Sequence, residues 1–156
     1  MAVMRGLVLL FLVFSVENAV GARFRKQAED CSFGWKLFGV KCFKFFPQTV
    51  DWVVAETNCQ SLDANLASVR SKAQNDFLLS LLPANTRVWI GGHDGEMENQ
   101  WLWSDGTRFI YTNWCNSQPD NFRASEHCLE ISFTDNRCWN DESCSTKLAY
   151  ICARTP

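Results

Sequence analysis

Eight cysteines, all after residue 30, constrain the fold of this chain more than any other feature of its sequence. An even number of cysteines in an exported chain predicts a framework of disulfides, although the sequence alone leaves many connectivities open. The rival use of such thiols is a zinc site completed by His93 or His127. Because no Cys-x-x-Cys spacing occurs, disulfides are favoured. The cysteines lie at positions 31, 42, 59, 115, 128, 138, 144 and 152.

The N-terminus has the pattern of a secretory signal. Arg5 precedes an apolar run over residues 6–14, and the small residues at 19–22 are typical of a cleavage site. The run is too short to span a bilayer. We therefore predict a signal peptide over 1–22, a flexible lead-in over 23–30 and one domain over 31–154, in a secreted, extracellular protein without membrane insertion.

Composition and motifs exclude two classes of function. A net charge of -2 gives no electrostatic reason to bind nucleic acid. The chain has no Gly-x-Ser-x-Gly or His-Glu-x-x-His motif and only two histidines, and no catalytic motif in the sequence is expected to orient either histidine as a base. The protein is therefore predicted not to be an enzyme.

Local patterns predict an α+β fold. Residues 31–46 have the pattern of a hairpin, a helix is predicted from Thr49 or Asp51 to about Leu62, and a second helix follows Ser71 and stops at Pro83. The segment 105–125 is long and irregular, which is unusual in a compact domain unless the segment is functional. Short strands are predicted at 66–69, 88–91, 101–103, 128–133, 138–140 and 148–152.

The stretch from Cys115 to Cys144 is rich in short side chains that carry oxygen. Carboxylates and amide carbonyls are the ligands that calcium takes, and three carboxylates would neutralise the ion. A cis bond before Pro119 would turn the residues on either side of it toward one point. The alternative is a polar surface loop between two strands. The candidate ligands are Gln118, Asp120, Glu126, Asn140 and Asp141.

The order of these residues resembles the calcium and sugar site of the C-type lectin domain. The resemblance rests on Gln118-Pro119-Asp120, on Glu126 two residues before Cys128, and on Trp139-Asn140-Asp141. It continues in the sequences WIGG at 89–92 and WLWSDG at 101–106, and covers nearly everything from Cys31 to Cys152. It implies a C-type lectin-like fold: two helices packed on small antiparallel sheets, with a long calcium-binding loop region, stabilised by disulfides.

The resemblance also selects among the disulfides. It implies the pairs Cys31–Cys42, Cys59–Cys152 and Cys128–Cys144. Cys115 and Cys138 then remain for each other, and their pairing would clamp the two halves of the metal site together.

In this family the order Gln-Pro-Asp resembles galactose-type sites. The resemblance implies calcium-dependent binding of galactose-type glycans through Gln118, Asp120, Phe122, Glu126 and Asn140. Phe122 would stack on the sugar or fold back into the core, and both readings stay open. Only residues 121–125 separate Asp120 from Glu126, which is shorter than the glycine-rich insertion of strong galactose sites, so loose selectivity is expected.

A second, structural calcium site is common in such domains. Asp94 and Glu98 match two of its acidic ligands, whereas Asn121 and His127 stand at the other acidic positions. Histidine nitrogen is softer than oxygen, so this second metal site is expected to be weak or empty.

Two further functions fit the same scaffold. One is ice binding, because type II antifreeze proteins resemble this chain as small fish lectins do. Ice requires a flat, weakly polar patch, and Phe122, Arg123 and His127 argue against one. The other is a venom-type module that binds protein.

The even cysteine count argues against a covalent dimer and leaves room for a non-covalent homo-oligomer.

Overall fold

The computed structural model describes residues 31–131 and 134–156. The expected signal peptide and lead-in lie outside the described residues. Within the described part of the chain, no helix is both long and apolar enough to cross a bilayer.

One mixed sheet forms the centre of the domain. Its order is β1-β2-β8-β4-β6-β7, with β3 paired to β8 and β5 paired to β4. All pairings are antiparallel except β4 with β8, which is parallel. The α+β class and the two helices are confirmed, but the expected small antiparallel sheets are joined into one. The strands are β1 (Lys36–Phe38), β2 (Lys41–Val50), β3 (Asn65–Leu66), β4 (Val88–His93), β5 (Leu102–Trp103), β6 (Cys128–Ile131), β7 (Trp139–Glu142) and β8 (Leu148–Arg154).

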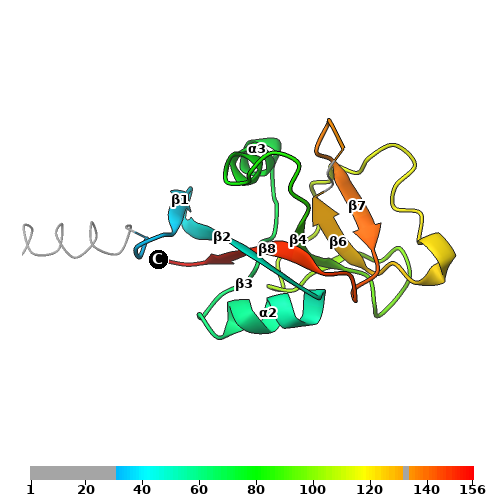
Figure 1. Ribbon diagram of the computed structural model, residues 1–156, viewed down its shortest axis with the longest axis horizontal. Coiled ribbons are helices and arrows are strands. Elements are labelled where there is room, and N and C mark those ends of the chain that lie inside the picture. Colours follow the sequence, from blue (N-terminus) through cyan, green and yellow to red (C-terminus); the bar gives the residue numbers. More distant parts are fainter. Residues whose placement is uncertain (1–30, 132–133) are drawn as a thin grey trace, which may run out of the picture.

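Two helices of nine residues begin at side-chain caps. The carboxylate of Asp51 accepts from the backbone N–H of Val54 before α2 (Trp52–Gln60), and the hydroxyl of Ser71 accepts from Gln74 before α3 (Lys72–Ser80). Each cap satisfies one backbone donor that the first turn leaves free. Figure 1 shows the two helices on opposite sides of the sheet.

Each helix therefore covers its own hydrophobic cluster. Leu78 of α3 packs with residues such as Ile90 and Ile151, and Cys59 of α2 packs with residues such as Trp89. Gly91 lies in β4, where neighbouring atoms approach closely: a Cβ built there would lie 2.8 Å from the carbonyl oxygen of Leu66.

Trp139, at the start of β7, connects the first cluster to the loops. It is fully buried, and its indole N–H donates to Asn75 of α3 over 2.8 Å. Edge contacts from Trp103, Tyr111 and Trp114 surround it. Because Asn140 and Asp141 follow immediately, this packing sets where their side chains lie.

Four disulfides cross-link the domain in the pairs that the sequence reasoning proposed. Cys59–Cys152 joins α2 to β8, and Cys128–Cys144 joins β6 to the segment after β7. The other two are Cys31–Cys42 and Cys115–Cys138. No cysteine among the described residues is free.

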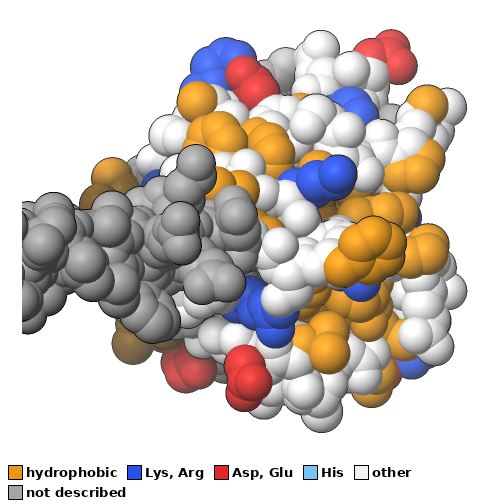
Figure 2. Space-filling model, turned by 90° about the vertical axis from the view of Figure 1, so that its left-hand side faces the viewer, with side chains coloured by type: hydrophobic (Ala, Val, Ile, Leu, Met, Phe, Trp, Pro, Cys, Tyr) orange, Lys and Arg blue, Asp and Glu red, His pale blue; other side chains and the backbone are white. Residues whose placement is uncertain are grey.

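The two ends of the domain differ in character. The C-terminus and the β1–β2 hairpin lie at one end, and the loops of residues 105–125 reach the other (Figure 1). Figure 2 shows the hairpin end, where hydrophobic and basic side chains mingle and acidic ones appear only near the edges of the view. Val40 at the hairpin turn is 81% exposed. The acidic clusters described below belong to the loop end.

Candidate metal centre

The backbone brings two distant segments together at the loop end. The N–H of Cys115 donates to the carbonyl of Trp139, and the N–H of Trp139 donates to the carbonyl of Asn113, each over 2.8 Å. The Cys115–Cys138 disulfide lies at the same crossing. The peptide bond between Gln118 and Pro119 is cis. The loop that carries Gln118 and Asp120 is thereby held beside β7.

Three carboxylates converge at this crossing. Oxygen atoms of Asp120, Glu126 and Asp141 all lie within 4.8 Å of one another. Asp141 is buried, and its two carboxylate oxygens accept from the backbone N–H groups of Asp120 (3.1 Å) and Asn121 (2.7 Å). Asp141 therefore shapes the loop in addition to adding charge.

Burial, and to a lesser degree the repulsion between these carboxylates, raises the pKa values of Glu126 and Asp141. Burial raises the pKa of Glu126 to about 7; the backbone N–H of Phe122 opposes this shift, and the neighbouring charges of Asp141, Glu142 and Asp120 add to it. Burial also raises the pKa of Asp141, against the two backbone N–H groups that it accepts from. Like charges at this spacing disfavour ionisation unless a cation lies between them.

Two amide side chains complete the set that was predicted from the sequence. The side-chain oxygen of Gln118 is buried and has no hydrogen-bond partner among the described residues. Such an orphaned oxygen is costly unless something outside the protein pairs with it. The side-chain nitrogen of Asn140 donates to Glu130 over 2.9 Å, which leaves its carbonyl oxygen as the end that could coordinate. The donor set therefore fits a hard cation such as calcium.

A charged network behind Asn140 was missed by the sequence reasoning. Glu130 of β6 is completely buried and forms two hydrogen bonds with Arg87, which also contacts Glu142 at 2.7 Å. These contacts raise the pKa of Arg87 above its ordinary value. A single glutamate in the buried strand Cys128–Ile131 is the signal that could have revealed it.

Phe122 lies beside the carboxylates on the surface. Its side chain is 57% exposed, and the Arg123 guanidinium lies 5.0 Å from the centre of its ring. The reading in which Phe122 folds back into the core is therefore wrong.

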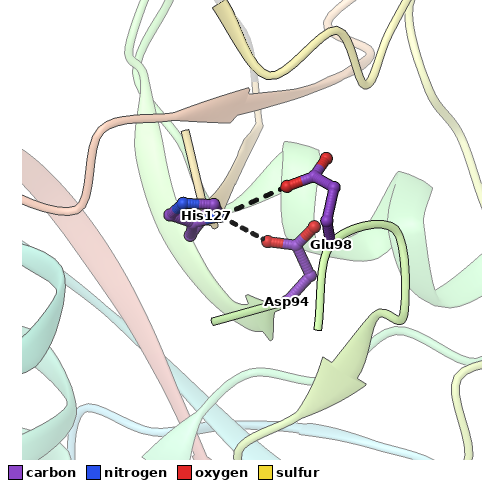
Figure 3. Close-up of side chains that lie close together, drawn as sticks. All are labelled: Asp94, Glu98 and His127. Atoms are coloured by element: carbon purple, nitrogen blue, oxygen red, sulfur yellow. Dashed lines mark hydrogen bonds and ion pairs between the residues drawn. The ribbon is translucent and has the colours of Figure 1, made fainter. Parts of the chain in front are cut away.

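The residues expected at the second metal site also come together. Asp94, Glu98 and His127 offer ligand atoms within 4.8 Å of one another (Figure 3). Asn121 donates from its side chain to Glu98 over 2.7 Å. Here an imidazole replaces a carboxylate, so the set does not match the all-oxygen shell of calcium.

The fold and its loops thus define a disulfide-stabilised α+β domain that gathers acidic and amide side chains at one end. A family model for the lectin C-type domain matches residues 48–154. The chain belongs to the C-type lectin domain family. This family is not enzymatic, which confirms that the chain is a non-catalytic protein.

Known relatives include lectins and ice-binding proteins. The chain is 35% identical over 150 residues to the galactose-specific lectin nattectin of Thalassophryne nattereri, covering 93% of this chain and 94% of that protein. It is 41% identical over 132 residues to ladderlectin of Oncorhynchus mykiss, covering 82% and 68%. A solved Ca2+-dependent type II antifreeze protein, in its Ca2+-free form, aligns with a TM-score of 0.77 at 36% identity, over 80% of this chain and 100% of that one.

Proposed function

We propose that the protein is a secreted, calcium-dependent carbohydrate-binding protein of the galactose type. The observation that carries the proposal is the convergence of the three carboxylates of Asp120, Glu126 and Asp141. The buried side-chain oxygen of Gln118, two positions before Asp120, has no hydrogen-bond partner among the described residues and adds support. The ligands would be Gln118, Asp120, Glu126, Asn140 and Asp141.

A bound calcium ion would supply coordination positions for two neighbouring hydroxyls of a sugar ring. The carboxylates of Asp120 and Glu126 would accept the hydroxyl hydrogens, and the amides of Gln118 and Asn140 would donate N–H groups to the hydroxyl oxygens. The exposed ring of Phe122 is available to stack on the apolar face of the sugar. Few sugar atoms would be buried, so affinity for one sugar should be weak and multivalency should strengthen binding to cells.

Two observations support galactose over mannose. The acid and the amide stand in the order Gln118-Pro119-Asp120, and one relative is described as galactose-specific. Exchanging the acid and the amide exchanges donors and acceptors around the diol, which changes the hydroxyl geometry that fits best.

The test is retention on immobilised galactose and immobilised mannose, with calcium and with a chelator. We expect retention on galactose only in calcium. The double variant Gln118→Glu with Asp120→Asn keeps the formal charge around the metal, so it should still bind calcium while its preference moves toward mannose. Wild-type protein that passes through the galactose column in calcium would contradict the proposal.

The pKa of Glu126 predicts how calcium binding depends on pH. Protons compete with the metal for this carboxylate, so the calcium dissociation constant should be about tenfold larger at pH 6 than at pH 8. The stability of the metal-free protein should depend on pH in the opposite direction. A carboxyl group whose pKa is raised in the folded state favours folding at low pH, and this contribution is lost as the pH rises through about 7. Calcium titration calorimetry at the two pH values measures the first effect, and Glu126→Gln should flatten it.

Ice binding is the second candidate, favoured by the similarity to a type II antifreeze protein. The exposed Phe122 with Arg123 over its ring makes a bulky and charged surface beside the site. Measurement of thermal hysteresis decides between the two: slowed ice growth by a protein that ignores galactose would establish the antifreeze function.

A further inference from the structure

The cluster of Asp94, Glu98 and His127 combines a nitrogen ligand with two carboxylates. The Nδ1 atom of His127 lies 2.9 Å from an oxygen of Asp94 and 3.6 Å from an oxygen of Glu98. Figure 3 shows both carboxylates pointing at the imidazole from one side.

These separations suit a small cation. Ligand atoms placed about 2.0–2.1 Å from a tetrahedral zinc ion lie roughly 3.3 Å from each other, between the two observed distances. Calcium binds at longer distances and takes roughly six to eight oxygen ligands. The softer imidazole nitrogen favours zinc and other borderline metals over calcium.

The cluster is built on hydrogen-bonded backbone at the end of β4. The N–H of Asp94 donates to the carbonyl of His127 over 3.2 Å and continues the pairing of β4 with β6, so these two residues face each other across the sheet end. The N–H of Met97 donates to the carbonyl of Asp94, and this turn returns the chain so that Glu98 faces the same point.

The orientation of Asp94, the most buried residue of the cluster, is fixed by a further hydrogen bond. The carboxylate of Asp94 is 0% exposed, and its second oxygen accepts from the N–H of Asn99 over 2.8 Å. The side-chain nitrogen of Asn121 donates to Glu98 over 2.7 Å, on the same carboxylate oxygen that faces His127. Partners that fix ligand orientation in this way are typical of metal centres.

We propose that Asp94, Glu98 and His127 form a zinc-binding site in place of a second calcium site. The metal takes the position of the hydrogen that now joins His127 to Asp94, and a water completes the fourth coordination position. The site shares no ligand with the proposed calcium centre, so each can be tested while the other is disabled.

The experiment is calorimetric titration of the disulfide-bonded protein with zinc chloride at neutral pH, in millimolar calcium. We expect one zinc ion per chain, bound despite the calcium. His127→Asn should weaken zinc at least tenfold, whereas the matched control His93→Asn, which changes the other histidine, should leave it unchanged. Cobalt substituted for zinc should give visible absorption bands that His127→Asn removes.

Two further variants separate this site from the calcium centre. Asp120→Asn should keep zinc binding while losing calcium at the first centre. His127→Asp supplies a third carboxylate, so it should weaken zinc and strengthen calcium at this cluster. Unchanged zinc affinity in His127→Asn, lost zinc in His93→Asn, or displacement of zinc by calcium would each overturn the proposal. A cooperative thermal unfolding transition, measured for each variant, is the control that the variant is folded.

Discussion

Replacing Arg87 with methionine is expected to lower the free energy of unfolding by about 3 kcal/mol at neutral pH, the lower end of what breaking a buried ion pair costs. The substitution leaves the carboxylate of Glu130, which is 0% exposed, without its main counter-charge. Burial already raises the pKa of Glu130, and that shift is opposed by hydrogen bonds from Arg87 and Asn140 and by the positive charge of Arg87. Denaturant unfolding of wild type and variant measures the loss.

The pH dependence of this loss has a definite sign. Without Arg87 the folded-state pKa of Glu130 rises further above its unfolded value, so the variant loses stability as the pH rises and regains it as the glutamate takes up a proton. The stability difference between wild type and variant should therefore shrink as the pH falls. Adding Glu130→Gln to Arg87→Met should recover much of the loss, because no buried charge then remains.

The matched control is the exposed ion pair of Lys72 with Asp76 on α3, at 2.7 Å. Lys72→Met removes a cation of similar reach from a solvated pair, and such pairs contribute little to stability. A loss in Arg87→Met no larger than in Lys72→Met would contradict the role assigned to burial.

Local chemistry was enough to predict the helices and most strands. Ser71 caps the second helix as predicted, and of the two predicted caps for the first helix, Thr49 or Asp51, the structure has Asp51. The first helix was predicted to reach about Leu62 but ends at Gln60, and Leu62 is 38% exposed. The parallel pairing of β4 with β8 joins Val88 to Ala149, and no local periodicity reports contacts between such distant residues.

For the candidate site too, some residues could be predicted from the sequence and others could not. Its proposed ligands are visible in the sequence because they are surface polar residues in a recognisable order. The residues that position them are not: Glu130 supports Asn140 from within a strand, and its partner Arg87 is 43 positions away. Asn75 fixes Trp139 from another element, 64 positions away. A residue that acts through a distant partner has no local pattern to reveal it.

Removing one carboxylate from the candidate calcium centre is expected to weaken calcium on the order of 100-fold, because the charge count of the ligands largely sets affinity for this ion. Asp120→Asn is the cleaner test. The Asp120 side chain is exposed and makes no hydrogen bond within the described part of the chain, so the variant removes a ligand and its charge without breaking a hydrogen bond. Calorimetry measures the affinity, and the rise in melting temperature with millimolar calcium should largely disappear.

Asp141→Asn should differ from Asp120→Asn even without metal. Both oxygens of Asp141 accept backbone N–H groups from the loop, and an amide can accept with only one of its two ends. The variant should therefore lose calcium and also unfold more easily in chelator, whereas Asp120→Asn in chelator should be at least as stable as wild type because it relieves repulsion among the carboxylates. If Asp120→Asn binds calcium as tightly as wild type, the three carboxylates do not hold the metal together, and the proposed sugar site loses its basis.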